Sequence, residues 1–163
     1  MLSTLLILSA CGDDGGGGDD APSVDAGPGG GADPEALGAL CGLNQDVCPD
    51  EAPSCLVFEE STSLVGFCSA VCISDGTFQT DEDSQIMVVD PPLSTGDATC
   101  SPLYTGILGV PRCGATVNVS PPPPLEPSTS YTFSASCVID CGPGGLCPGE
   151  LTCDVQRGYC VAP

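Results

Sequence analysis

Cysteine content is the feature that most constrains this chain. The 163 residues include 13 cysteines but only three tyrosines, four phenylalanines and no tryptophan. Cysteines at this density, with so few large aromatic side chains, are typical of exported proteins in which disulfides replace a large hydrophobic core. Since 13 is odd, at least one cysteine must stand outside any complete set of intrachain disulfides. The composition therefore predicts a small disulfide-rich fold made mainly of β-strands and loops.

Eight of the cysteines fall into two copies of one sequence pattern. Each copy begins with Cys-Gly, continues through Cys-Pro-x-Glu to a Ser/Thr-Cys pair, and ends with Gly-aromatic-Cys. The largest length difference between the copies lies in Leu56–Val65, which predicts a lengthened hairpin in the first copy. The two copies contain Cys41, Cys48, Cys55 and Cys68, and Cys141, Cys147, Cys153 and Cys160.

The remaining cysteines of this region, Cys72, Cys100, Cys113 and Cys137, lie in or bound the segment between the two copies. Because each group of four can close two bridges on itself, we expect three units of four cysteines. The units are a first four-cysteine unit over 37–70, a central β segment over 71–139, and a second four-cysteine unit over 140–163. Within a unit we expect the first cysteine to pair with the third and the second with the fourth. An alternative partition assigns Cys100 to the first copy and Cys113 to the second, which gives two six-cysteine modules.

The central segment carries the clearest strand patterns. Residues 130–137 alternate strictly between apolar and hydroxyl side chains, which predicts a half-buried strand with Tyr131, Phe133, Ala135 and Cys137 on one face. Residues 115–119 alternate in the same way, and 85–89 is a third, more continuously apolar candidate. The proline-rich run 120–127 cannot donate to a ladder and predicts a rigid connection, with a proline-rich ligand for a partner as the alternative. No stretch has a helical period, so we expect a small antiparallel sheet.

The first 36 residues have a different composition. An apolar run over 2–10 is followed by Cys11 and then by sequence rich in Gly and Asp. This run is far shorter than the roughly 20 residues that a membrane-spanning helix needs, which favours a cleaved export signal. Residues 11–36 have almost nothing apolar to bury and predict a disordered tether. The alternative is that the run forms an ordinary buried strand or helix and that Cys11 joins a disulfide.

The residues Leu8-Ser9-Ala10-Cys11 resemble the lipobox of bacterial lipoproteins. This resemblance implies that residues 1–10 are a signal peptide, that cleavage occurs before Cys11, and that lipid on Cys11 anchors the chain in a membrane. Setting Cys11 aside leaves 12 cysteines, which can all pair. With its Gly/Asp tether and Cys-Pro-x-Glu units, the whole chain is similar to cysteine-rich lipoproteins of myxobacteria and other large-genome Gram-negative bacteria. The likeness implies the bacterial cell envelope, and Gly12 after Cys11 implies the outer rather than the inner membrane.

Charge limits the partners of this chain. It has 22 acidic residues, two arginines, no lysine and no histidine, for a net charge of −20. A surface with two cations cannot neutralise phosphates, which argues against nucleic acid. Cationic partners and weak divalent cation binding are allowed, and Asp81-Glu82-Asp83, near Asp75, offers carboxylate oxygens. That patch lacks the spacing of a calcium loop, so a solvated acidic loop is the favoured interpretation and no metal site is predicted.

The sequence offers little for catalysis. Without His or Lys there is no Ser-His, Cys-His or Ser-Lys pair, and no phosphate-binding glycine loop is present. No cofactor and no catalytic residue is predicted. We therefore expect a non-enzymatic surface binding or structural module that presents loops such as Leu56–Val65 to an envelope protein or polysaccharide. The alternative is a small secreted effector, such as a protease inhibitor with one disulfide-braced loop.

Overall fold

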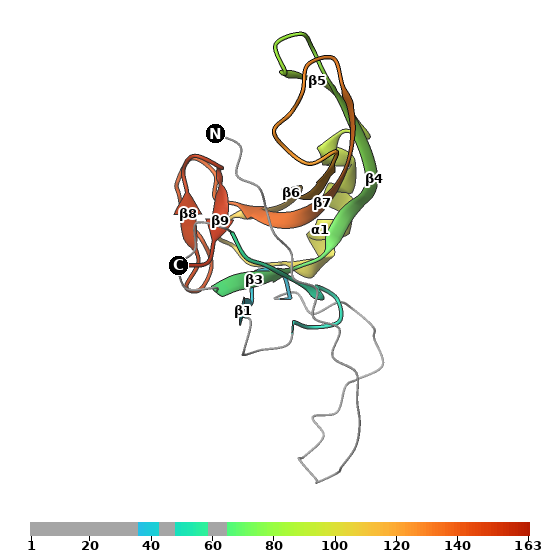
Figure 1. Cartoon of the computed structure of the whole chain (residues 1–163). Helices are drawn as coiled ribbons and strands as arrows, with labels where there is room; N and C mark the ends of the chain where they lie inside the picture. Colours follow the sequence, from blue (N-terminus) through green and yellow to red (C-terminus); the bar gives the residue numbers. More distant parts are fainter. Residues whose placement is uncertain (1–35, 43–47, 59–64) are drawn as a thin grey trace, which may run out of the picture.

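The computed structural model describes residues 36–42, 48–58 and 65–163 of the chain. The predicted signal peptide, Cys11 and all of the predicted tether except Ala36 lie outside these residues. The described residues form nine strands and one short helical segment, and the strands make two antiparallel sheets (Figure 1). No helix in these ranges is long and apolar enough to cross a membrane. Six disulfides brace this mainly β structure, which confirms the predicted fold class.

The elements follow one another from the first four-cysteine unit to the second. The helical segment consists of η1 (Leu93–Gly96), α1 (Asp97–Cys100) and η2 (Ser101–Leu103). The strands are β1 (Leu40–Gly42), β2 (Ser54–Leu56), β3 (Val65–Ser69), β4 (Val71–Thr80), β5 (Ile86–Asp90), β6 (Val110–Ser120), β7 (Ser130–Asp140), β8 (Thr152–Asp154) and β9 (Tyr159–Val161).

The larger sheet is built around β7, which pairs with β4 on one side and with β6 on the other. The sheet continues from β4 to the edge strand β5, and the end of β7 pairs with β9. Tyr131, Phe133, Ala135 and Cys137 of β7 are at most 5% exposed, which confirms the face predicted from their alternation. The predicted strand at 115–119 is confirmed as part of β6, and the one at 85–89 is confirmed as β5 except for residue 85, which precedes it.

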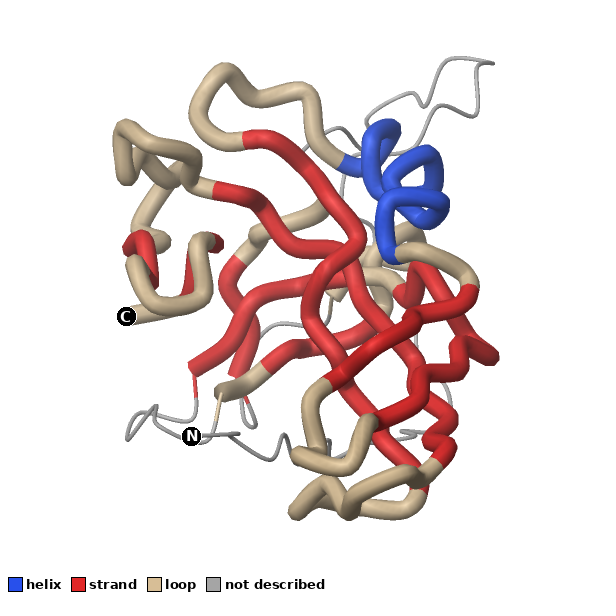
Figure 2. The backbone as a smooth tube through the Cα atoms, turned by 90° about the horizontal axis from the view of Figure 1, so that it is seen from above, coloured by secondary structure: helices blue, strands red, loops and turns tan. Residues whose placement is uncertain are grey.

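The helical segment was not predicted, because its α-helical part spans only four residues and has no period to detect. It packs against β6 and β7, and Figure 2 shows its turns gathered on one side of the strands. Every residue from Ala135 to Ile139 is buried, so both faces of β7 are covered there. The expectation that Ser136 lies on a polar face is therefore wrong, since its side chain is 1% exposed.

The disulfides divide the described chain into three units of four cysteines, and in each unit the first pairs with the third and the second with the fourth. The pairs are Cys41–Cys55 and Cys48–Cys68, Cys72–Cys113 and Cys100–Cys137, and Cys141–Cys153 and Cys147–Cys160. This pairing confirms the expected pattern. The alternative of two six-cysteine modules is wrong, because Cys100 and Cys113 both bond within the central unit.

The three units share one local arrangement. The third and fourth cysteines of each unit lie opposite each other on neighbouring antiparallel strands, and the pairs are Cys55 and Cys68, Cys113 and Cys137, and Cys153 and Cys160. Each member bonds to a different cysteine, so two disulfides stand side by side on every strand pair. In the outer units the residues before the first and fourth cysteines also pair, as Leu40 with Phe67 and Asp140 with Tyr159. The sequence repeat is therefore a structural repeat.

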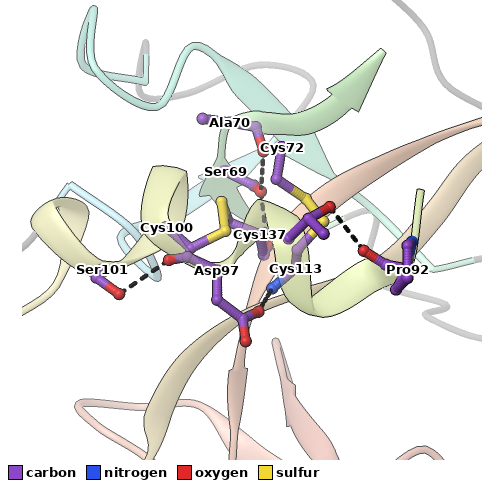
Figure 3. The surroundings of a disulfide bond; sticks show 10 residues. Ser69, Ala70, Cys72, Pro92, Asp97, Cys100, Ser101, Cys113 and Cys137 are labelled. Carbon is purple, nitrogen blue, oxygen red and sulfur yellow. Dashed lines mark hydrogen bonds between the residues drawn. A yellow bond between two sulfur atoms is a disulfide. The ribbon is translucent and has the colours of Figure 1, made fainter. Parts of the chain in front are cut away.

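One central disulfide joins β4 to β6, through Cys72 and Cys113, and the other fastens the helical segment to the sheet (Figure 3). Cys100, at the end of α1, bonds to Cys137 of β7, and the Asp97 carboxylate accepts the Cys113 N–H at 2.9 Å. Beside them the buried Ser69 hydroxyl donates to the Cys137 carbonyl at 2.7 Å. Residues from all three units join one continuous buried cluster, including Leu37, Phe67, Tyr131, Ile139 and Leu151.

Candidate binding groove

An apolar groove of about 490 Å³ opens on the side of the larger sheet that carries Phe78 and Phe133. These two side chains, from β4 and β7, lie with ring centroids 6.0 Å apart, and Phe78 also stacks on Tyr131 at 5.0 Å. Val117 and Val119 extend the lining along β6. Phe78 and Phe133 are only 6% and 5% exposed, so their rings are packed into the core and do not form open aromatic platforms.

The proline-rich loop between β6 and β7 forms a second wall, through Pro122, Pro123 and Leu125. Its position follows from hydrogen bonds to the end of β4. The Thr80 hydroxyl donates to the Glu126 carbonyl at 2.6 Å and accepts the Thr129 N–H at 3.0 Å. The Glu126 N–H donates to the Tyr131 hydroxyl. These contacts confirm that the run is a connection between strands, and they hold it over the sheet.

The edge strand β5 supplies the third wall, through Ile86 and Val89, and Leu93 follows it. In β5 the side chains of Ile86, Met87 and Val88 are 52%, 67% and 57% exposed. Natural edge strands usually carry a lysine, a proline or a bulge that blocks pairing with another chain. Here β5 has no cation, Pro91 lies just beyond its end, and its pairing with β4 shifts register once, between Gln79 and Thr80. Next to the groove, the described chain thus exposes an apolar strand edge.

Both arginines of the chain are engaged away from β5. Arg112 of β6 contacts the Asp140 carboxylate at 3.2 Å, and Arg157 forms an ion pair with Asp154. The Arg157 guanidinium also lies over the Phe58 ring, 5.3 Å from its centroid, and Phe58 packs against Tyr159 at 5.8 Å. This cluster joins the first unit to the last, and Tyr159 also lines the groove.

The same cluster shifts two pKa values. Burial works to raise the pKa of Asp154, but the backbone N–H groups of Arg157 and Gln156 and the Arg157 guanidinium outweigh it. They hold that pKa below its usual 3.8. Burial raises the pKa of Tyr159 above its usual 10.0, against the opposing charge of Arg157. The Tyr159 hydroxyl is therefore neutral at physiological pH, so it brings no charge to the groove.

Acidic residues lie at both ends of β5. Asp81, Glu82 and Asp83 occupy the turn before it, and Asp90 ends it. The Asp81 carboxylate accepts the N–H groups of Asp83 and Gln85 at 2.9 and 2.8 Å, so it closes the turn. Asp75 accepts the Ser74 hydroxyl at 2.9 Å, on β4. Across the described ranges the groups of three or more side chains that converge closely enough for a metal ion consist of cysteines, not carboxylates.

The predicted site residues are thus placed as follows. The twelve paired cysteines all lie in disulfides, so the three close sulfur clusters, within 4.8 Å in each unit, offer no thiolate ligands in this oxidised form. Cys11 lies outside the described residues, as do residues 59–64 of the Leu56–Val65 hairpin. The strands β2 and β3 that flank this hairpin are paired antiparallel, as predicted.

Sequence reasoning missed the groove itself. Its lining is drawn from β4, β5, β6, β7 and β9, from Leu93 and from the β6–β7 loop. The curved sheet brings these segments of the chain together (Figure 1). The one local signal is the apolar run over 85–89. Its pattern predicts a strand but does not predict that the side chains of this strand are exposed. Searches against protein-family models, curated proteins and solved structures find no match for this chain.

Proposed function

We propose that this chain is a lipid-anchored, non-enzymatic binding module of the bacterial cell envelope, and that its groove holds an apolar part of another envelope protein. The observation that carries the proposal is the apolar groove of about 490 Å³ on a sheet fastened by disulfides. Concave, mostly apolar sites with a few polar groups are the usual form of binding sites in proteins. Six disulfides are typical of an oxidising, extracytoplasmic compartment, which agrees with export.

A protein is favoured over a polysaccharide by the chemistry of the lining. Sugar hydroxyls lose their hydrogen bonds to water on binding, and a site must replace them with converging polar groups. The groove offers the polar side chains of Thr116, Asn118 and Tyr159 against a majority of apolar ones. Its phenylalanine rings are buried rather than open for stacking on a sugar face. Apolar side chains of a polypeptide match this lining better.

The lipid anchor and the cellular location belong to the same proposal. The lipobox at Cys11 and the tether of residues 11–36 support attachment to a membrane with the folded part held away from the headgroups. Gly12 supports the outer membrane. Fractionation of host membranes tests this location. We expect the chain to be recovered with outer-membrane markers, and its recovery with inner-membrane markers would overturn that part of the proposal.

The groove is tested with N-phenyl-1-naphthylamine, a neutral probe whose fluorescence rises in apolar surroundings. The sample is the full chain with Cys11→Ser, exported so that its disulfides form. We expect saturable binding of one probe per chain. Val119→Asp places a charge in the lining and should weaken binding at least tenfold, because a carboxylate there must lose water or exclude the probe.

The matched control is Val110→Asp, on the same strand β6 but 51% exposed and outside the lining. We expect it to change the dissociation constant less than twofold. Absence of saturable binding, or an equal effect of both substitutions, would refute the groove as the binding site. The protease-inhibitor alternative stays a prediction, since its loop includes residues 59–64, outside the described part.

A further inference from the structure

The free edge of β5 stands directly beside the groove. In the sheet order β5 is the terminal strand and pairs only with β4 among the described residues. Its five residues span about 17 Å at the usual rise of a strand. An exposed edge of this kind is a template on which an extended peptide adds one more strand, with main-chain hydrogen bonds supplying affinity.

The groove gives such a peptide a place for its side chains. Phe78 and Val89 are opposite each other on β4 and β5, so Val89 shares the face of the sheet that lines the groove. A strand added beyond β5 points every second side chain to this same face. Apolar residues at alternate positions would therefore continue the lining beside Val89. Ile86 reaches the same face through the register shift between β4 and β5.

Charge selects the remaining side chains. The turn before β5 carries Asp81, Glu82 and Asp83, and the strand ends at Asp90. Both arginines form ion pairs elsewhere. Arg112 of β6 pairs with Asp140 of β7, and Arg157 pairs with Asp154 in the β8–β9 hairpin. A peptide bound to this edge thus lies near carboxylates at both of its ends, and the two arginines of the chain are engaged elsewhere. Basic residues at the positions between the apolar ones complement this field.

The same charges disfavour a second copy of the chain as the occupant. Antiparallel pairing of two β5 strands would bring the acidic turn of each copy toward Asp90 of the other. Each chain also has a net charge of −20, and like charges placed together across an interface cost affinity. Hence a cationic partner fits this edge better than self-association.

We propose that the groove and the β5 edge together bind an extended segment of a partner protein in which apolar and basic residues alternate. This inference rests on the proposed binding function and specifies its partner. The segment adds as a strand to β5, places its apolar side chains in the groove, and directs its basic side chains to the acidic groups at the strand ends.

The test uses the same exported Cys11→Ser chain and an eight-residue capped peptide of alternating lysine and valine. We expect saturable binding by calorimetry that weakens several-fold between 50 and 500 mM salt, since charge pairs at the surface are screened. A peptide of alternating glutamate and valine should bind at least tenfold more weakly. Two lysine–valine peptides, methylated at the backbone nitrogens of either all lysines or all valines, test strand addition, and at least one should lose binding.

Substitutions on the protein locate the site. Val88→Lys puts a cation on the exposed face of β5 and should weaken binding of the lysine–valine peptide at least tenfold. The control, Val155→Lys, makes the same change at an 85% exposed valine in the β8–β9 hairpin and should have less than a twofold effect. Unchanged disulfide content and circular dichroism verify the fold of both variants.

The outcomes separate the two proposals. Binding of the naphthylamine probe without any binding of the lysine–valine peptide would overturn strand addition and leave the groove function standing. Equal binding of the basic and acidic peptides, or full binding retained by both methylated peptides, would also overturn it. A dimer in analytical ultracentrifugation that Val88→Lys dissociates would show that a second copy, not a cationic segment, occupies the edge.

Discussion

Two buried serines, Ser69 and Ser136, offer a direct test of the structure because one hydroxyl is bonded and the other is not. Ser69 donates to the Cys137 carbonyl at 2.7 Å and is 0% exposed. Ser136, next to Cys137 on β7, is 1% exposed, and its hydroxyl has no hydrogen-bond partner among the described residues. Removing each hydroxyl therefore has opposite consequences for the free energy of unfolding.

Ser69→Ala loses a bond worth about 0.5–1.5 kcal/mol net and leaves the carbonyl with one donor fewer. Ser136→Ala removes a group whose burial without a partner costs about 1–3 kcal/mol. We expect Ser69→Ala to destabilise by about 1 kcal/mol and Ser136→Ala to stabilise by about as much, a separation of about 2 kcal/mol. Both changes delete the same atom, so differences in packing and in the unfolded chain largely cancel.

The assay is urea unfolding under non-reducing conditions, followed by far-UV circular dichroism and by tyrosine fluorescence. Equal slopes for the two variants and the parent chain are required before the midpoints are compared. Ser136→Ala should move the midpoint up and Ser69→Ala should move it down. Equal destabilisation by both would refute the assignment of Ser136 as an unbonded buried hydroxyl, and with it the local register of β7.

Three further predictions concern the groove wall, the disulfides and the ion pair. Thr80→Val removes the hydrogen bonds of the Thr80 hydroxyl to Glu126 and Thr129 of the β6–β7 loop and should weaken naphthylamine binding several-fold; an unchanged dissociation constant would show that the loop holds its place without them. Replacing Cys100 and Cys137 by alanine should cost about 4 kcal/mol, against about 3 for Cys141 and Cys153, because their sequence separations are 37 and 12 and the loop-closure entropy scales with length. Reversal of that order in non-reducing unfolding would contradict the loop argument. The pKa of Asp154 is lower in the folded chain, so its stabilisation is present above pH 3.8 and is lost as the pH falls through the folded value. Asp154→Asn should therefore destabilise by up to about 1 kcal/mol at pH 7 and by less at pH 2, as thermal unfolding at the two pH values would show.

The sequence predicted the parts of the fold that depend on local pattern. Strict alternation located β7 and the core of β6, because a half-buried strand imposes a period of two. The repeat and the even number of cysteines in each group favoured three units with first-to-third and second-to-fourth pairing, while the two-module partition stayed open on the sequence alone. The strands on either side of the predicted hairpin, β2 and β3, are paired antiparallel, while residues 59–64 of the hairpin lie outside the described residues.

What the sequence could not predict depends on contacts between distant segments. The helical turns of 93–103 are held by the Cys100–Cys137 bond and by packing on β6 and β7 rather than by helical propensity. The alternation places Ser136 on the polar face of its strand, and it is buried only because other segments of the chain cover that face. The exposure of Ile86, Met87 and Val88 likewise follows from the place of β5 at the end of the sheet order, which no local pattern encodes.

The intact mass of the protein from its native host, measured without reduction and followed by thiol counting under denaturing conditions, tests the central claim most directly. The six disulfides and the proposed anchor together predict the mass of Cys11–Pro163 less 12 hydrogens plus acyl chains, with no free thiol. Retention of Met1–Ala10, absence of acyl chains, or several free thiols would contradict an envelope-anchored and fully bridged binding module.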